Sequence, residues 1–401
     1  MTSLPLAGVR VLECASVIAG PYCSYVLTLL GAETIKIERP HQGDWMRGQG
    51  GDAQWTASGM GSGFLSCNAG KQSVTLNLAD PRGVRIAREL AARSDVMIEN
   101  WRPGTAAKLG VGFEDIKAAN PRIVYCSISG FGQDGPMAPR PAYDHIVQAM
   151  SGIMAVTGTP ETAPSRTGPP LVDYLTGVSA ALAVVAALRE RDRTGQAQQV
   201  DVGMLDCAVT AMGSMISAHV NGAIPAAPIG NSAASGAPSS GLFPTRSSPL
   251  TIVANTEAQF RALCGALGRL DLVEDPRFRE FGPRKRNQDA LREIIGACLA
   301  ERSAIDWEQA LAAVGVPCGA VRSVPEVLED EQVEARELFR RVAVPGHDRD
   351  ALLPAAGFKL NGERVGPDRA PPALGADTEA VLAALGYDAA ARRALRDAGV
   401  L

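Results

Sequence analysis

The first half of the chain alternates between short apolar runs and stretches with helical periodicity. Runs of the strand type occur at 9–14 (VRVLEC), 34–38 (TIKIE), 95–99 (DVMIE) and 123–127 (IVYCS). Stretches of the helical type occur at 21–30, 81–93 and 113–119. Because strands and helices alternate along the sequence, we expect a mostly parallel sheet covered by helices on both faces. The pattern indicates a Rossmann-like α/β domain.

The second half has a different pattern, interrupted by two loop-like stretches. An apolar helix is expected at 174–189 and a strand at 199–202, and residues 222–249 are rich in Gly, Pro, Ser and Ala with almost no charge. The elements expected afterwards are a strand at 250–254, helices at 257–269, 286–300 and 306–313, a Pro-rich stretch at 366–374 and a helical hairpin at 377–398. The predicted regions are a large Rossmann-like domain (1–221), a linker (222–249), a small α+β domain (250–340) and a C-terminal segment (341–401).

Composition and charge exclude several classes of function. The chain has 401 residues, 39 Lys and Arg against 43 Asp and Glu, 46% hydrophobic residues and 20% charged residues. This balance is typical of a soluble globular protein and gives no basic footprint for nucleic acid. Eight cysteines are scattered without a C-x-x-C pair, as expected of buried thiols in a reducing compartment. The N-terminus has no signal-peptide pattern, and the apolar run 178–188 is too short to span a bilayer. We expect a cytoplasmic protein without a membrane partner.

Familiar catalytic motifs are absent from the sequence. It contains no P-loop, no G-x-S-x-G elbow and no H-E-x-x-H, and its first turn reads ASVIAGPYCS in place of the dinucleotide fingerprint G-x-G-x-x-G. The four histidines are too dispersed to form a zinc site with cysteines. Metal catalysis is therefore not expected.

Short polar motifs follow several of the predicted strands. They supply the cations Arg39, Arg102, Lys108 and Arg140, together with the flat ring of Trp101. Ligands of open α/β sheets bind at the carboxyl ends of the strands, where guanidinium groups can gather phosphates and an indole can stack. Each Arg alone is typical of a solvated surface. As a group at one edge, these residues predict an anion-binding site.

Asp173 is the sharpest candidate for chemistry. It lies in GPPLVDYLTG (168–177), where a turn rich in Gly and Pro enters an apolar helix. One interpretation is a helix cap or first-turn residue that complements the helix dipole. The other is a carboxylate nucleophile, with glycines that let a bulky electrophile approach. The residue pattern does not separate the two.

Taken together, these motifs resemble the class III coenzyme A transferases, the CaiB/BaiF family, over essentially the whole chain. The segments that carry the resemblance are AGPYCSYVLTLLGAETIKIERP (19–40), NAGKQSVTLNL (68–78), ENWRPG (99–104), SISGFGQDGP (127–136), AYDHIVQAMSG (142–152), GPPLVDYLTG (168–177), LFPT (242–245), GVPCGAV (315–321) and APPALGADTEAVLAALGY (370–387). In this family, the aspartate matching Asp173 attacks an acyl-CoA thioester to form a mixed anhydride. The CoA thiolate then converts the anhydride into an aspartyl-CoA thioester, from which an acceptor carboxylate takes CoA.

The resemblance also implies which residues bind coenzyme A. The matching positions are Val17, Ile18, Arg39, Asn100, Trp101, Arg102, Lys108, Arg140, Tyr143 and Asp144. Asp144 is either an auxiliary carboxylate or a plain helix-starting residue. The family's glycine-rich lid loop corresponds to 230–241, which is rich in Ser and Ala here. An interlocked homodimer is implied, with the C-terminal segment returning to the large domain. No tightly bound cofactor is implied, because the CoA thioester is a substrate.

The sequence indicates the class of reaction more closely than it indicates the substrates. We expect succinyl-CoA as donor and a small dicarboxylic acid as acceptor, with Arg166 and Arg246 as candidates for its second carboxylate. One alternative is CoA transfer within a single dicarboxylyl-CoA. Another is a 2-methylacyl-CoA racemase, which uses a histidine in a G-H-D motif, where this chain has Ala142-Tyr143-Asp144 and His145 one position later. A third is a non-catalytic CoA-binding protein.

Overall fold

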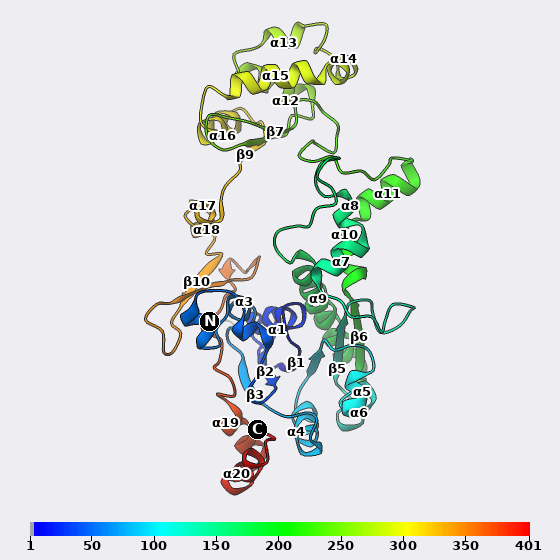
Figure 1. Ribbon diagram of the computed structural model, residues 1–401, viewed down its shortest axis with the longest axis vertical. Helices are drawn as coiled ribbons and strands as arrows, with labels where there is room; N and C mark the ends of the chain where they lie inside the picture. Colours follow the sequence, from blue (N-terminus) through cyan, green and yellow to red (C-terminus); the bar gives the residue numbers. More distant parts are fainter. Residues whose placement is uncertain (1–3) are drawn as a thin grey trace. The chain divides into compact units, whose positions relative to one another are not determined.

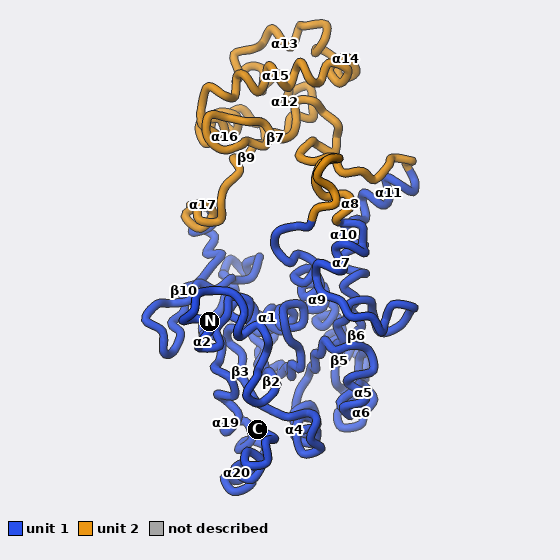
Figure 2. Tube along the Cα trace, in the orientation of Figure 1, with its two compact units in different colours: residues 1–153, 166–221, 332–401 blue, residues 154–165, 222–331 orange. Residues whose placement is uncertain are grey.

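The computed structural model describes residues 4–401 and divides the chain into two compact units (Figures 1 and 2). Unit 1 comprises the chain up to Ile153, residues 166–221 and residues 332–401. Unit 2 comprises residues 154–165 and 222–331. The C-terminal segment therefore lies in the same unit as the N-terminal half. The roles that the sequence assigns to these regions, including a lid within 222–249, stay predictions.

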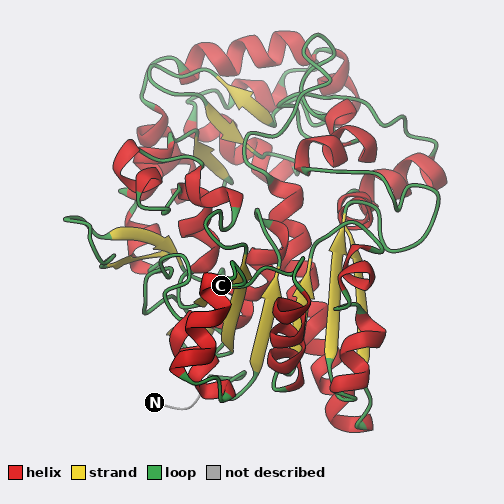
Figure 3. Cartoon of the chain, turned by 60° about the horizontal axis from the view of Figure 1, so that its bottom comes forward, coloured by secondary structure: helices red, strands yellow, loops and turns green. Residues whose placement is uncertain are grey.

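The core of unit 1 is a six-stranded parallel sheet (Figure 3). Its strands are β1 (Arg10–Cys14), β2 (Glu33–Glu38), β3 (Gln72–Thr75), β4 (Val96–Glu99), β5 (Val124–Ser129) and β6 (Gln198–Gly203). Their order is β3-β2-β1-β4-β5-β6, and Leu12 of β1 is in register with Ile35 and Met97 on its two neighbours. This is the doubly wound order, whose direction of winding reverses between β1 and β4. The mostly parallel sheet predicted from sequence is confirmed.

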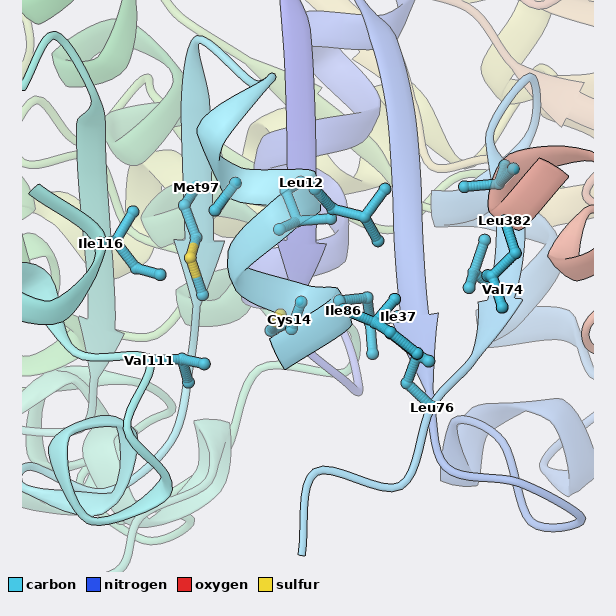
Figure 4. Packing of buried hydrophobic residues seen from close by; sticks show 14 of the residues in the cluster. Leu12, Cys14, Ile37, Val74, Leu76, Ile86, Met97, Val111, Ile116 and Leu382 are labelled. Atoms are coloured by element: carbon cyan, nitrogen blue, oxygen red, sulfur yellow. The ribbon is translucent and has the colours of Figure 1, made fainter. Parts of the chain in front are cut away.

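Strand alternation sends neighbouring side chains into two separate cores. Leu12, Met97 and Tyr125 pack on one face with α4 (Pro81–Ala92) and α6 (Phe113–Ala119) (Figure 4). Val11, Val96, Ile98, Val124 and Cys126 pack on the other face with α1 (Ala19–Leu29) and α9 (Leu171–Thr194). Because helices cover both faces of the sheet, side chains near the middle of each strand are buried whichever face they point to. This burial explains why the strands are continuous apolar runs in the sequence.

The C-terminal segment completes the first of these cores. Its helices α19 (Thr378–Leu385) and α20 (Ala389–Asp397) bring Leu382 and Leu395 into the cluster of Leu12 and Ile86. Leu401, which follows α20, belongs to the same cluster. The Ser73 N–H donates to Asp377 Oδ2 at 2.8 Å and the Thr75 N–H donates to Thr378 Oγ1 at 3.0 Å, so strand β3 is tied to this segment. Two two-stranded pairs precede these helices, β10 (Phe339–Val342) with β11 (Ala351–Pro354) and β12 (Lys359–Leu360) with β13 (Glu363–Arg364).

Short helices fill the remaining connections. They are η1 (Trp45–Gly48), α2 (Ala53–Ala57), α3 (Ser62–Asn68), α5 (Thr105–Leu109), α7 (Asp144–Ser151), α8 (Ile153–Val156), α10 (Met204–Ala211), α11 (Gly213–Gly222), α17 (Val324–Leu328) and α18 (Glu331–Ala335). Of these elements, α7 and α10 matter most for the site, because both pack against α9.

Unit 2 is a small α+β body. A three-stranded antiparallel sheet of β7 (Gly241–Phe243), β8 (Leu250–Ile252) and β9 (Cys318–Ala320) packs against helices. The helices are α12 (Glu257–Ala266), α13 (Asp271–Glu274), α14 (Phe281–Arg286), α15 (Gln288–Leu299) and α16 (Ala304–Ala313). Phe260 and Trp307 are buried in its core. The loop predicted as a lid is anchored here, since Ser239 is buried and its Oγ donates to the Ala254 carbonyl at 2.8 Å.

Helix α9 is longer than the sequence pattern suggested. It runs from Leu171 to Thr194 rather than over 174–189, and by length and composition it would suffice to cross a membrane. Half of its most apolar window is buried within the fold, which is typical of the core helix of a globular unit. The sequence-based expectation that the apolar segment is too short to span a bilayer is therefore wrong.

Candidate active site

The reversal of winding between β1 and β4 opens a crevice at the carboxyl ends of these strands. Ser16 follows β1 and Asn100 follows β4. The Ser16 N–H donates to Asn100 Oδ1 at 3.0 Å, and Asn100 Nδ2 donates to the Ser16 carbonyl at 2.7 Å. The two loops are thus joined at the point where doubly wound folds bind their ligands.

The turn between β1 and α1 is held in a strained conformation. Val17 has a φ of 72°, in the left-handed region that a β-branched residue rarely adopts. Its N–H donates to Asp44 Oδ1 at 3.2 Å, and Lys36 Nζ donates to the neighbouring Ala15 carbonyl at 2.8 Å. Lys36 Nζ also lies 3.0 Å from Asp44 Oδ2. A buried ion pair beneath the turn therefore fixes the residues that line the crevice.

A glycine lets α9 approach the start of α1. A Cβ on Gly177 would lie 2.8 Å from the Ala19 carbonyl oxygen and 3.0 Å from the Tyr22 ring, so a larger residue would push the helices apart. Gly177 is one helical turn beyond Asp173 and shares its face of α9. The close approach brings the carboxyl group of Asp173 to the cavity that the β1–α1 turn lines.

Asp173 is buried at the wall of this cavity. The side chain is 8% exposed and lines a cavity of about 290 Å³. The predicted residues that line the same cavity are Val17, Ile18, Asn100, Trp101, Arg102, Arg140 and Tyr143. Burial, together with the nearby charge of Asp144, raises the pKa of Asp173 to about 7. A carboxylate that is poorly solvated in this way is a more reactive nucleophile than one in water.

Asp173 is not the cap of α9 but an acidic residue of its first turn, so the helix-start interpretation is confirmed for the first turn and wrong for the cap. The N-cap position of α9 is Pro170, and no side chain at that position caps the helix. Asp144 of α7 takes over this task, since its Oδ2 accepts the N–H groups of Val172 at 2.8 Å and Asp173 at 3.2 Å. The Asp173 carboxyl group is thereby left to face the cavity.

A second, larger cleft adjoins the cavity. It has a volume of about 820 Å³, and Arg39, Trp45 and Trp101 line it above the buried Lys36 and Glu38. Ser16 and Trp101 line both hollows, so the two form one groove along the carboxyl edge of the sheet. The groove thus has cations along its length and the carboxyl group of Asp173 in one of its two parts.

Not every predicted residue lines this groove directly. Lys108 lines a hollow of about 470 Å³ with Arg85 and Arg88, which shares Leu78, Ala79 and Leu109 with the larger cleft. Asp144 lies buried behind Asp173 and lines none of these hollows.

The two arginines predicted for an acceptor carboxylate lie elsewhere. Arg166 is exposed and is not among the residues that line the cavity of Asp173. Arg246 belongs to unit 2, where its N–H donates to the Arg302 carbonyl at 3.0 Å. Within the cavity of Asp173, the cations are Arg102 and Arg140.

Sequence reasoning missed several residues of the site. Asp44 is remote in sequence from the β1–α1 turn that its side chain holds. Ser129, at the end of β5, lines the cavity, and its Oγ has no hydrogen-bond partner among residues 4–401. Glu99 is buried, its carboxylate accepts the Trp101 N–H at 2.8 Å, and burial raises its pKa to about 7. Gln148 could have been found, because it lies four residues after Asp144 on one helix face.

Metal-ligating side chains do not gather in the part of the chain that the structure describes. Residues 4–401 contain no group of three or more His, Cys, Asp or Glu side chains placed to hold an ion. The eight cysteines are free. The groove is lined by the carboxyl group of Asp173, by arginines and by the indole of Trp101.

Comparison with known proteins identifies the family. The description "CoA-transferase family III" matches residues 6–378. The mouse succinyl-CoA:glutarate CoA-transferase is 36% identical over 99% of this chain and 90% of its own length. The acetyl-CoA:oxalate CoA-transferase of Acetobacter aceti is 38% identical over 86% of this chain and 88% of its own. A CaiB/BaiF family protein from Brucella suis has a TM-score of 0.85 and 31% identity, covering 96% of this chain and 100% of its own. The chain therefore belongs to CoA-transferase family III, the CaiB/BaiF family, and is an enzyme of that class.

Proposed function

We propose that this enzyme moves coenzyme A from succinyl-CoA to a small dicarboxylic acid, with Asp173 as the nucleophile. The observation that carries the proposal is the buried carboxyl group of Asp173, which lies at the end of a groove lined by cations and an indole. The named relatives act on glutarate and oxalate, both of which are dicarboxylic acids. The CoA thioester is a substrate, and no resident cofactor takes part.

The proposed reaction conserves the thioester energy through two acyl intermediates. The Asp173 carboxylate attacks the thioester carbonyl, a C–O bond forms, and the C–S bond breaks to release CoA thiolate and leave a mixed anhydride. The thiolate then attacks the Asp173 carbonyl, which releases succinate and leaves an aspartyl-CoA thioester. The acceptor carboxylate attacks this thioester, and the same two steps in reverse give the new acyl-CoA and free Asp173.

The groove suggests which residues hold the substrates. Arg39 and Trp101, with Lys108 in the adjoining hollow, suit the phosphates and adenine of CoA, because guanidinium, ammonium and indole groups recognise these parts. Arg102 and Arg140 suit the second carboxylate of the acid, since both lie in the cavity of Asp173. Val17, Ile18, Asn100 and Tyr143 line the same cavity and suit the thioester end.

The racemase alternative finds less support. The position of the racemase histidine is taken by Tyr143, a residue that is 59% exposed. His145 stacks parallel to that ring with centroids 6.4 Å apart and is not among the residues that line the cavity of Asp173. The histidine base of the racemase motif is therefore absent from the lining of this cavity.

The proposal is tested by incubating the purified enzyme with succinyl-CoA and a panel of mono- and dicarboxylic acids. Mass spectrometry is expected to detect a new CoA thioester for a dicarboxylic acid, and no product with Asp173→Ala. Deuterium exchange into 2-methylacyl-CoA serves as the racemase control. A thioester that Asp173→Ala forms at the wild-type rate would contradict the role of Asp173. Exchange at C2 without CoA transfer would favour the racemase.

We also propose that the enzyme is a cytoplasmic homodimer. Helix α9 exposes an apolar stripe of Leu171, Leu175, Val178, Leu182 and Val185, each at least 36% exposed. The spacing of four, three, four and three residues is that of a helix seam that packs against another helix. Such a stripe rarely stays in water on a soluble chain, and a second copy supplies a matching apolar face.

Substitution within this stripe is expected to split the dimer. Leu182 is 71% exposed in the single chain, so Leu182→Glu leaves the fold intact but places a charge in the proposed seam. Sedimentation is expected to give a dimer for the wild type and a monomer for this variant. Leu270→Glu is the matched control, because Leu270 is 57% exposed in unit 2 and belongs to no such stripe. A wild-type monomer, or a Leu182→Glu dimer, would refute the proposal.

A further inference from the structure

We propose that Asp144 is a positioning residue that holds the segment carrying Asp173 and whose charge favours the acylated forms of Asp173. This inference rests on the proposed function, because it assigns to Asp173 the role of a nucleophile. It concerns a buried carboxylate on α7 that touches the backbone of Asp173 but does not line the cavity.

The first step of the argument is the hydrogen bonding of Asp144. Its Oδ2 accepts the N–H groups of Val172 at 2.8 Å and Asp173 at 3.2 Å, while its Oδ1 accepts Gln148 Nε2 at 2.6 Å. Gln148 Oε1 in turn accepts the Thr167 N–H at 3.0 Å. Asp144 and Gln148 are both buried. These two side chains of α7 therefore hold the turn that leads into Asp173 by hydrogen bonds at its start and at its end.

The second step concerns the other charged and titratable groups near Asp173. The loops after β4 and β5 supply Arg102, Arg140 and Tyr143, whose side chains are exposed to solvent. Helix α1 contributes Tyr22 and has no charged residue, and Tyr174 adjoins Asp173 on α9 itself. Helix α10 has Asp206, which is exposed, as is Asp201 of β6. No side chain among residues 4–401 donates a hydrogen bond to the Asp173 carboxylate. Glu99 at the end of β4 is also buried, but Asp144 is the charged group that acts on the Asp173 carboxyl group.

The third step follows from the charges along the reaction. Free Asp173 carries a negative charge next to that of Asp144, and like charges at close range repel. When Asp173 is acylated, its C–O bond replaces the C–S bond of the thioester, and the negative charge departs on the CoA thiolate. The mixed anhydride and the aspartyl-CoA thioester are neutral at this position. Acylation therefore relieves the repulsion, as protonation of Asp173 does.

The charge of Asp144 consequently shifts two equilibria of Asp173, ionisation and acylation, away from the free carboxylate. It opposes ionisation of Asp173, and it favours acylation over the free carboxylate. Removal of this charge is expected to ease ionisation of Asp173 and to lower the amount of acylated enzyme at equilibrium. Each pKa unit corresponds to about a tenfold change in either equilibrium. A residue with a purely structural role would change neither quantity.

The test uses two neutral variants of the full-length enzyme. Asp144→Asn and Asp144→Ser each keep an oxygen that can accept the helix N–H groups, so at least one of them is expected to fold. The acidic limb of kcat/KM against pH reports ionisation of Asp173 in the free enzyme. This limb is expected near pH 7 in the wild type and about one unit lower in both variants. After incubation with succinyl-CoA, intact-mass measurement is expected to detect about tenfold less aspartyl-CoA adduct.

Two controls separate charge from shape. Asp144→Glu keeps the charge and is expected to keep the acidic limb near its wild-type position. Asp206→Asn removes an exposed carboxylate from the neighbouring α10 and is expected to leave the limb unchanged. If the neutral variants are active with an unshifted limb and undiminished adduct, the inference fails and the proposed function stands. If the wild type transfers no CoA, or Asp173→Ala still does, the proposed function fails.

A readout without substrate completes the design. The pH dependence of urea unfolding, taken as the difference between each protein and its Asp173→Asn derivative, follows the same ionisation. Its midpoint is expected about one unit lower in the Asp144→Asn background. A midpoint that coincides in both backgrounds overturns the inference whether or not CoA transfer is observed.

Discussion

Replacement of Asp173 by Asn is expected to abolish CoA transfer and yet to stabilise the fold at pH 8 by as much as about 4 kcal/mol. Loss of the nucleophile removes both covalent intermediates, so we expect activity to fall by at least about 10³-fold. The stabilisation arises because burial and the charge of Asp144 raise the pKa of Asp173 from its ordinary 3.8 to about 7. A difference of about three units, at 1.36 kcal/mol each, sets the upper limit.

The sign of the pH dependence follows from proton binding. With its higher pKa, folded Asp173 binds a proton more tightly than unfolded Asp173 does. Its stabilising contribution is complete below the unfolded pKa of about 4 and is lost as the pH rises through about 7. An uncharged Asn escapes this loss. The advantage of Asp173→Asn over the wild type should therefore grow between pH 5 and pH 8.

Urea unfolding at pH 5, 6, 7 and 8 measures this advantage. Intrinsic fluorescence is suited to the measurement, because three of the four tryptophans, Trp45, Trp55 and Trp101, lie in unit 1 with Asp173. Asp206→Asn, an exposed carboxylate on α10, is the matched control and should change stability by less than about 0.5 kcal/mol. An advantage of Asp173→Asn that is equal at pH 5 and pH 8 would show that the carboxyl group of Asp173 is ordinary.

The sheet and its functional edge were predictable because their signals are local. The apolar runs that became β1, β2, β4 and β5 have the composition of strands buried on both faces. Polar residues that follow such strands gather at one edge, so chain order alone predicts Arg39, Trp101 and Arg102 as site candidates. The family resemblance then assigned the nucleophilic role to Asp173, which local pattern could not.

The supporting contacts were not predictable, because they join segments that the sequence does not relate. Asp44 holds Val17 from 27 residues away, and Asp144 caps α9 from 28 residues away. Helix α9 extends to Leu171 because this cap comes from α7, so a local search for a capping residue could not find its start. Strand β3 is only four residues long and is tied to the C-terminal segment, a contact that no local pattern encodes.

The same dependence on remote contacts makes Glu13→Gln the substitution with the largest expected loss of stability. Glu13 of β1 is fully buried between two ammonium groups, with Oε1 2.6 Å from Lys36 Nζ and Oε2 2.7 Å from Lys71 Nζ. Although burial alone would raise the pKa of Glu13, the two lysines lower it to about 2. Removing one partner from a buried ion pair leaves an uncompensated charge, which costs about 3–5 kcal/mol. Because the β1–α1 turn rests on Lys36, activity should fall as well.

Charge balance within this cluster predicts how the loss can be recovered. In Glu13→Gln, Lys36 keeps Asp44 as its partner at 3.0 Å, whereas Lys71 loses its carboxylate. The double variant Glu13→Gln/Lys71→Met removes both unpaired members, so urea unfolding should find it more stable than Glu13→Gln alone. Burial already lowers the pKa of Lys71, so the deficit of the single variant should shrink as rising pH removes this proton.

Glu33→Gln is the matched control, because Glu33 forms an exposed ion pair with Arg10 at 4.0 Å and should change stability by at most about 1 kcal/mol. A double variant no more stable than Glu13→Gln would mean that Lys71 does not depend on Glu13 for its charge.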